Sequence, residues 1–172
     1  MQRNLISDKK LESVSPYVRK AARARQRGTI YPYEIVRMLT DASYPNDYNL
    51  PRGKFTEFDV KVNLENGSQE IIEVKRPYGE NKGNIVFGII TNFVKKHPYG
   101  LKRVLILADS TKDMGSLAED ECRRVIAAID LAQKHNLPVE WVPISAGARI
   151  DMASGTENLD WTARTLKRII EF

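Results

Sequence analysis

The second half of the chain alternates between apolar runs of strand length and helical patterns, and this order constrains the fold more than any other feature. In order, the predicted elements are strands at 85–93 and 104–108, a helix at 116–135, a strand at 139–144 and a helix at 156–172. From Ala118 to Ala132, apolar residues step by four, three, four and three, which keeps them on one helical face. A strand, a helix and a strand in succession form a β-α-β crossover, so we predict an α/β fold.

The two predicted helices each carry a start signal. Ser116 and Glu119 form the S-x-x-E pattern of a capping box, and Ser154 and Glu157 repeat it. The last helix still runs at Phe172 without a stop signal, so we expect a truncated chain. The residues of this helix that we expect to face the core are Leu159, Ala163, Leu166 and Ile170.

The first half divides into a basic arm over 1–54 and a predicted β-hairpin that opens a second part, 55–172. The hairpin is indicated by alternating apolar and polar residues on either side of Asn66-Gly67, a strong turn signal. The predicted elements are an irregular or helical stretch at 1–28, a helix at 31–40, a loop at 42–54, a strand at 55–64 and a returning strand at 70–75.

The composition is typical of a globular domain in a reducing compartment. The chain has 172 residues, 42% of them hydrophobic, which suffices for one domain with a core. The single cysteine, Cys122, excludes an internal disulfide and reads as a small buried residue. No apolar run has the length of a membrane span, and the N-terminus lacks the apolar region of a secretory signal. We therefore expect a cytoplasmic protein with no membrane partner.

The net charge of +5 comes largely from a basic cluster near the N-terminus. This cluster fits either a solvated helix face or a patch for a polyanion, meaning nucleic acid or a phosphate-bearing cofactor. Charge alone does not separate these two interpretations. The cluster consists of Arg19, Lys20, Arg23, Arg25 and Arg27.

Several catalytic arrangements are excluded by what the sequence lacks. The two histidines, His97 and His135, fall in a predicted turn and at a helix end, and no paired Cys/His spacing could hold zinc. Ser145 lies in a run that resembles a nucleophile elbow, but Pro143 replaces the first glycine and no histidine follows to act as a base. There is also no phosphate-binding loop of the G-x-x-x-x-G-K-[ST] type.

The strongest chemical signal is the turn of small residues from Ser145 to Arg149, which directly follows the strand predicted at 139–144. Backbone N–H groups of small residues can approach a ligand closely, and a cation beside them suits a phosphate or a developing oxyanion. The sequence therefore predicts an anion-stabilising site without a side-chain nucleophile.

A second hypothesis is a metal-dependent nuclease. Asp59 on one hairpin strand and Glu73-Val74-Lys75 on the next resemble the P-D…(D/E)-x-K site, in which two carboxylates hold a divalent ion and a lysine orients water. A register that pairs Asp59 with Glu73 would bring the carboxylates together, and it also packs Phe58 well. Phe58 stands where the motif has proline, and a hairpin with a charged solvent face explains the same residues.

From Asn84 onward the chain resembles the N-terminal lobe of biotin-dependent acyl-CoA carboxyltransferases, the transferase part of acetyl-CoA carboxylase and its relatives. The resemblance is specific over about 84–172 and weaker over 29–83. The matching segments are Asp109-Ser-Thr-Lys-Asp-Met-Gly115-Ser116, Asp130-Leu-Ala, Leu137-Pro138, Ser145-Ala-Gly-Ala-Arg149-Ile150 and Ser154-Gly-Thr-Glu-Asn-Leu-Asp-Trp161, with Tyr31-Pro-Tyr-Glu34 and Phe55-Thr-Glu-Phe-Asp59 upstream.

This resemblance implies a partial crotonase-like lobe with a ββα spiral, preceded by a helical arm and a β-hairpin. It implies transfer of a carboxyl group from carboxybiotin to the α-carbon of an acyl-CoA, with no metal in this lobe. Its partners would be a biotin carboxyl carrier domain, a biotin carboxylase domain and the acyl-CoA, within a homodimer of the complete carboxyltransferase. Because the family's site lies between two lobes, we expect this chain to be inactive alone.

The resemblance also assigns roles to individual residues. The N–H groups of Ala146 and Gly147 match the family's glycine pair, the oxyanion hole on the biotin side. Ala148 and Arg149 would contact substrate, although Arg149 could equally be a salt bridge that holds the turn. Two departures are Ala146 in place of the first glycine and Asp151 where acetyl-CoA carboxylases often have glycine.

Gly115 and Ser116 match the segment that begins the next helix near the ligand, although an N-cap would explain them as well. A third hypothesis is a non-catalytic CoA-binding or interaction module that keeps the lobe without the chemistry. Nucleic acid is a partner only under the nuclease hypothesis.

Overall fold

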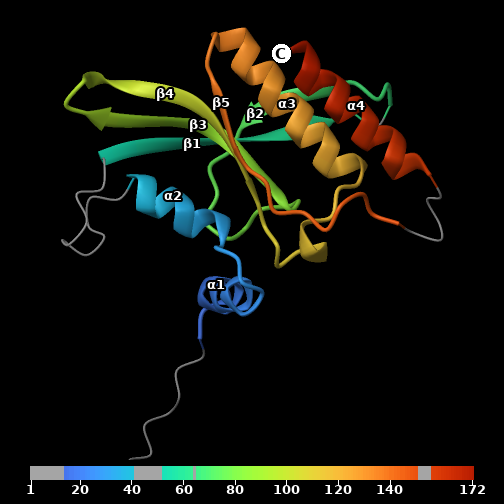
Figure 1. The fold of residues 1–172 in the computed structure, drawn as a ribbon, viewed down its shortest axis with the longest axis horizontal. Coiled ribbons are helices and arrows are strands. Elements are labelled where there is room, and N and C mark those ends of the chain that lie inside the picture. Colours follow the sequence, from blue (N-terminus) through green and yellow to red (C-terminus); the bar gives the residue numbers. More distant parts are fainter. Residues whose placement is uncertain (1–13, 41–51, 64, 151–155) are drawn as a thin grey trace, which may run out of the picture.

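The computed structural model describes residues 14–40, 52–63, 65–150 and 156–172, and its framework is one five-stranded sheet in the order β2-β1-β3-β4-β5 (Figure 1). All neighbouring strands are antiparallel except β4 and β5, which are parallel and joined through helix α3. The predicted β-α-β crossover and the α/β class are therefore confirmed. The elements are α1 Pro16–Gln26, α2 Pro32–Thr40, β1 Arg52–Val62, β2 Gln69–Glu73, β3 Ile85–Val94, β4 His97–Ala108, a short 3-10 turn Asp113–Gly115, α3 Glu119–His135, β5 Val139–Val142 and α4 Glu157–Glu171.

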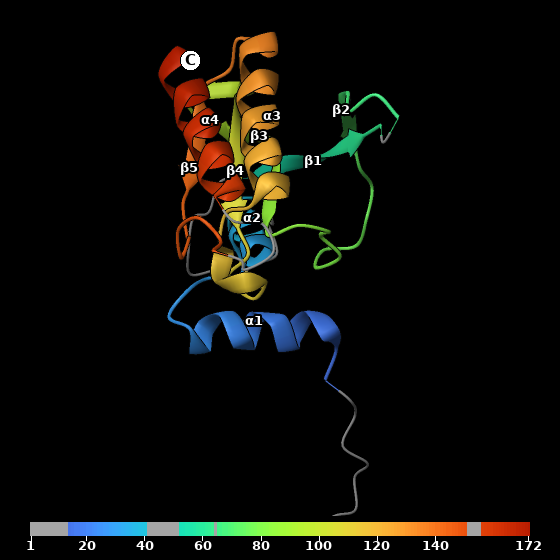
Figure 2. The ribbon, with the colours of Figure 1, turned by 90° about the vertical axis from the view of Figure 1, so that its right-hand side faces the viewer.

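The sheet has a hydrophobic cluster on each face. On one face, α3 packs Val125 and Ile129 against strand residues such as Phe87 and Ile106. On the other face, α1 and α2 contribute a second cluster around Tyr33, which includes further residues of β3 and β4. Figures 1 and 2 show α3 and α4 together on one side of the strands and α1 and α2 away from them. The sequence-based division at residue 54 stays a prediction, although α1 and α2 share a core with the sheet.

Helix α3 has the predicted apolar face, but it begins later than expected. Its N-cap is Ala118 rather than Ser116, and the Ala118 N–H donates to Glu121 Oε2 at 3.2 Å. Glu121 therefore supplies the side-chain half of a capping box that we had assigned to Glu119. The helix ends at His135, and its C-cap Asn136 adopts the left-handed conformation favoured at that position.

The predicted turn that contains His97 is wrong in position. Only Lys95 and Lys96 form the turn, and β4 already begins at His97, where it pairs with Val94. The strand accommodates Gly100 with a φ of 99°. A register shift between Asn92 and Val94 absorbs the irregularity, as β-bulges do.

Helix α4 has its predicted position but not its predicted orientation. Leu159, Leu166 and Ile170, expected in the core, are exposed, and Asn158 and Thr165 are buried instead. The helix therefore turns a polar face to α3. Ser154, expected to cap this helix, and most of the loop predicted at 42–54 lie outside the described residues.

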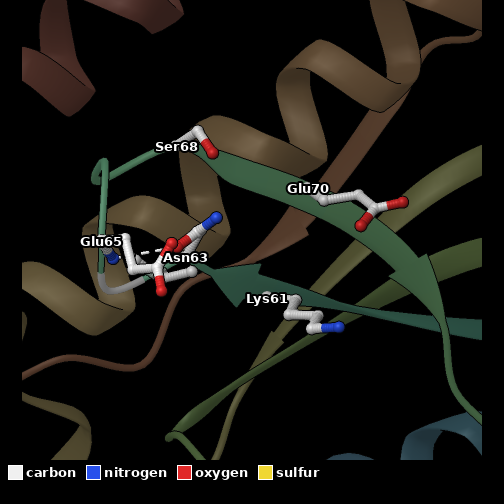
Figure 3. Close-up of a pocket in the computed structure, with 6 residues that line it drawn as sticks. Lys61, Asn63, Glu65, Ser68 and Glu70 are labelled. Carbon is white, nitrogen blue, oxygen red and sulfur yellow. Dashed lines mark hydrogen bonds between the residues drawn. The ribbon is translucent and has the colours of Figure 1, made fainter.

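The β1–β2 hairpin projects from the body of the sheet (Figure 2). Beside its tip lies an open hollow of about 520 Å³ lined by Lys61, Val62, Asn63, Glu65, Ser68 and Glu70, most of which Figure 3 labels. The Glu65 N–H donates to Asn63 Oδ1 at 2.9 Å, and this local hydrogen bond stabilises the hairpin tip (Figure 3). None of the site residues predicted from the sequence lines this hollow.

Candidate functional site

The turn that follows β5 is open to solvent, as an anion-binding backbone requires. Ser145, Ala146 and Gly147 are all exposed. Gly147 has a φ of 97°, and a Cβ built on it would meet no atom within 4 Å. The space in front of this backbone would therefore admit a ligand.

The loop that precedes α3 lies against this turn. Leu117 pairs in parallel with Ala148: the Leu117 N–H donates to Gly147 O, and the Arg149 N–H donates to Leu117 O, each at 2.8 Å. A Cβ on Gly115 would lie 2.3 Å from the carbonyl oxygen of Ile144, so only glycine permits this approach. The structure thus brings together Gly115, Ser116 and the turn, which are 30 residues apart in the sequence.

The two predicted oxyanion donors are not equivalent. The Gly147 N–H donates to Ser145 Oγ at 3.0 Å and is thereby engaged inside its own turn. A ligand would have to displace this hydroxyl to use the Gly147 amide. The Ala146 amide is thus the simpler of the two candidate donors.

Arg149 links three parts of the site. Its guanidinium forms an ion pair with Asp113, with 2.8 Å between Nη2 and Oδ2, and its Nε donates to Ser116 Oγ at 3.3 Å. Its carbonyl oxygen accepts from Asn158 Nδ2 of α4 at 2.9 Å. The structural role that the sequence left open for Arg149 is therefore present, and a contact with substrate stays a prediction.

A cavity of about 420 Å³ lies beside Arg149 and has a mixed charge. Carboxylates outnumber cations in its lining, so an anionic group would be attracted only close to Lys82 and Arg149. Among the described residues, no group of three or more His, Cys, Asp or Glu side chains has the geometry of a metal site. The lining residues are Lys82, Gly83, Asp113, Ala118, Glu119, Asp120, Glu121, Arg149, Asn158 and Trp161.

The nuclease hypothesis depended on a hairpin register that the structure does not have. Asp59 pairs with Ile72, and Glu73 pairs with Phe58, one residue away from the expected register. Since side chains alternate between faces along a strand, this shift puts Asp59 and Glu73 on opposite faces. Glu73 and Lys75 are exposed, whereas Asp59 is buried.

Asp59 belongs to a buried ionic network that the sequence did not reveal. Arg124 Nε and Arg76 Nη1 both donate to its carboxylate at 2.9 Å. Arg76 also pairs with Glu57, which accepts from the Tyr33 hydroxyl at 3.1 Å. The network joins α2, β1 and α3 through residues far apart in the chain, and no local pattern could have indicated it.

The two carboxyl groups of this network have opposite pKa shifts. Burial raises the pKa of Glu57 above its ordinary value, despite the ion pair with Arg76. Burial also acts to raise the pKa of Asp59, but Arg124, the Val60 N–H and Arg76 together lower it. The lowered pKa keeps the Asp59 carboxylate ionised, and it pairs with two arginines inside the fold. Its role is therefore structural.

Several residues of the basic cluster, which lies on α1 and its C-cap Arg27, contact other parts of the fold. Lys20 donates to the Gly79 carbonyl oxygen, Arg27 donates to the Ser110 carbonyl oxygen, and Arg25 lies 3.7 Å from a Glu34 carboxylate oxygen. Arg19 and Arg23 are exposed. Cations committed to protein partners fit a structural helix face better than a continuous polyanion patch. In the described part of the chain, no helix is long and apolar enough to cross a membrane.

Comparison with known proteins gives consistent matches to acyl-CoA carboxylases. No family model matches the chain. It is 28% identical over 137 residues to acetyl-CoA carboxylase of Saccharomyces cerevisiae and 29% identical over 108 residues to that of Dictyostelium discoideum, covering 78% and 60% of this chain. These alignments cover only 6% and 5% of the two relatives, so the chain spans a small part of their length.

A solved structure shows the same fold. The beta subunit of geranyl-CoA carboxylase from P. aeruginosa superimposes with a TM-score of 0.55 at 20% sequence identity, covering 88% of this chain and 24% of that subunit. The resemblance inferred from the sequence motifs is confirmed by these matches, and so is the fold expected for a partial lobe of such a subunit. Nothing in the comparisons favours a nuclease.

Proposed function

We propose that this chain is part of the carboxyltransferase of an acyl-CoA carboxylase, which transfers a carboxyl group from carboxybiotin to the α-carbon of an acyl-CoA such as acetyl-CoA. The observation that carries the proposal is the exposed backbone turn at 145–149, held against the loop at 113–117 by paired main-chain bonds. Both segments belong to the motif match, and the fold brings them into contact.

The chemistry that this turn supports is stabilisation of negative charge. Carboxyl transfer to the α-carbon of a thioester passes through anions, and fixed N–H donors stabilise such charge without reorganising. The Ala146 amide would act on the biotin side, joined by the Gly147 amide if Ser145 releases it. Carboxylated biotin would bring the carboxyl group and the base, which fits a site without a side-chain nucleophile.

The remaining site residues would position the substrate. Gly115 lets the loop reach the turn, and Ser116 orients the Arg149 guanidinium. Arg149 and Ala148 would line the substrate side, with Lys82 as a further cation near the cavity. Because Asp113 already neutralises part of the Arg149 charge, this arginine would bind an anionic group only if that pair opens.

The complete enzyme would need more than this chain. The proposed partners are a biotin carboxyl carrier domain, a biotin carboxylase domain and a second subunit of the complete carboxyltransferase. We expect the chain alone to lack carboxyl transfer, because it covers only about a quarter of the geranyl-CoA carboxylase subunit. A cytoplasmic location agrees with the single free cysteine.

The turn can be tested in a complete carboxyltransferase that contains this segment. Ala146→Pro removes the candidate N–H, and we expect carboxyl transfer to fall about 10²- to 10³-fold, as for other oxyanion donors. The matched control, Ala146→Gly, keeps the N–H and restores the family's residue, so its activity should be close to the parent's. Equal activity of all three proteins would disprove the role of this amide.

Two further assays separate the hypotheses raised by the sequence. Malonyl-CoA decarboxylation with free biotin, measured on the complete protein, should be positive for an enzyme and negative for a CoA-binding module. Titration with CoA and with duplex DNA should show binding of the first only. Magnesium-dependent DNA cleavage that Glu73→Ala abolishes would contradict the proposal.

A further inference from the structure

The outer face of α4 is apolar and exposed, which is unusual for a helix in a small domain. Leu159 and Leu166 are each 57% exposed, and Ile170 is 76% exposed. Figure 2 shows α4 running alongside α3 on the same side of the sheet. Apolar side chains grouped in this way on a soluble surface indicate an interaction site.

The orientation of α4 is held by its polar face, so the apolar face does not turn inward. Arg168 Nε pairs with Asp130 Oδ1 of α3 at 2.8 Å, and Thr165 is buried against α3. The Trp161 ring packs against the Arg123 guanidinium, with 4.4 Å from its carbon to the ring centroid. Rotating the helix to bury its leucines would break these contacts.

The apolar residues of this face follow a coiled-coil spacing. From Leu159 they step by four, three and four to Ala163, Leu166 and Ile170. Steps of three and four place them along one seam, and a seam of this kind is typical of helices that pair with another helix. We call these four residues the α4 seam.

The charges beside the α4 seam indicate which helix would pair with it. Asp160 and Lys167 lie along the same flank, seven residues apart, with side chains 58% and 75% exposed. Each also forms an exposed ion pair within its own helix, Asp160 with Arg164 and Lys167 with Glu171. When two such helices pack antiparallel, equivalent flanks meet, so Asp160 of each faces Lys167 of the other. A second copy of α4 therefore matches the first in the spacing of its apolar residues and in the charges of the facing flank.

We propose that the α4 seam is a self-association surface on which two copies of this chain pack their α4 helices antiparallel. Leu159 of one copy would then contact Ile170 of the other, and Ala163 would contact Leu166. Two short helices bury less than the ~800 Å² per partner of a standard interface. The dimer should therefore be weak and depend on protein concentration.

Sedimentation velocity of the 172-residue chain over a wide concentration range tests this proposal. We expect the sedimentation coefficient to rise with concentration, and Leu166→Glu to weaken dimerisation by about tenfold or more. Val18→Glu changes a similarly exposed apolar residue on α1, 51% against 57% for Leu166, and serves as the matched control, with no effect expected. Circular dichroism of each variant verifies the fold.

Charge reversal distinguishes antiparallel pairing of the helices from non-specific hydrophobic association. Asp160→Lys alone should weaken the dimer, because two cations then face each other, and Asp160→Lys with Lys167→Asp should restore it. A monomer at every concentration, an equal effect of Val18→Glu, or failure of the double variant to restore association would each overturn the proposal.

Discussion

Arg124 of α3 donates from its Nε to Asp59 Oδ1 of β1 at 2.9 Å, and the two side chains are only 9% and 6% exposed. This ion pair connects the main helix to the strand from which the projecting hairpin continues. A second arginine, Arg76, shares the same carboxylate at 2.9 Å. Arg76 also pairs with Glu57, so Arg124 depends on Asp59 more than Arg76 does.

Removing the carboxylate of this buried pair should destabilise the fold strongly. We expect Asp59→Ala to lower the free energy of unfolding by about 3–5 kcal/mol, because it leaves the buried Arg124 guanidinium without its carboxylate. Arg124→Ala should cost less, because Arg76 still pairs with Asp59. Urea denaturation measures the effect. The double variant should lose less than the sum of the single variants, which a double-mutant cycle detects.

An exposed pair provides the control for this comparison. Arg164 pairs with Asp160 at 2.8 Å on the surface of α4, with both side chains more than half exposed. Arg164→Ala should change the free energy of unfolding by no more than about 1 kcal/mol. Similar losses for Asp59→Ala and Arg164→Ala would contradict the assigned role of the buried network.

The lowered pKa of Asp59 predicts how its contribution depends on pH. Because its folded pKa lies below the unfolded value, Asp59 stabilises the fold fully above the unfolded pKa and loses this effect as pH falls through the folded one. The stability difference between the parent and Asp59→Asn should therefore shrink as pH falls from about 6 to about 2.

The contribution of Glu57 to stability should change with pH in the opposite direction to that of Asp59. Its folded pKa is raised, so its contribution is complete below the unfolded pKa and declines as pH rises through the folded value. Glu57→Gln should consequently gain stability relative to the parent as pH rises from about 4 toward neutrality. Urea denaturation across this pH series checks both residues, and parallel pH curves for the two variants would be inconsistent with the assigned shifts.

Gly115 and Gly147 offer a matched pair of substitutions at positive φ. Gly115→Ala combines backbone strain with a Cβ placed 2.3 Å from Ile144 O, so we expect about 1–2 kcal/mol from strain and a further ~1–3 kcal/mol from overlap. Gly147→Ala meets no atom within 4 Å and should lose only the strain component. Thermal and urea unfolding measure both, and a larger loss for Gly147→Ala would refute the close approach.

Cys122 should be inert toward thiol reagents in the folded protein. It is 0% exposed, and burial raises the pKa of its thiol although Thr165 and Thr162 act to lower it. We expect labelling only after unfolding in urea. Ala22→Cys, at an exposed position on α1, is the positive control that should react at once, and rapid labelling of Cys122 in the parent would argue against its burial.

The strands and helices of the second half were predictable because apolar residues recur in the sequence at the spacing that buries one face of each element. The runs at 85–93 and 104–108 fall within β3 and β4, and the steps through Cys122 and Val125 predicted the face of α3 that is buried. The contact between the turn at 145–149 and the loop at 113–117 was not predicted, because two segments so far apart in the sequence leave no local signal of their contact.

Two predictions failed for related reasons. The predicted hairpin register was wrong because Asn66-Gly67 lies inside a longer loop between the paired Val62 and Gln69. A turn signal in the sequence does not specify how many residues the loop contains, and the loop length sets the register. The orientation of α4 was wrong because an apolar stripe was assumed to face the core. Polar residues of α4 contact α3 instead; Arg168, for example, pairs with Asp130.

The sequence by itself determined the α/β order, the apolar face of α3 and the small-residue turn after β5, because spacing along the chain directly encodes which residues a regular element buries. Only the tertiary structure decided the partners of Asp59, the outward face of α4 and the packing of Gly115 against Ile144. These depend on contacts between distant segments, whose energies are set by geometry that no local pattern contains.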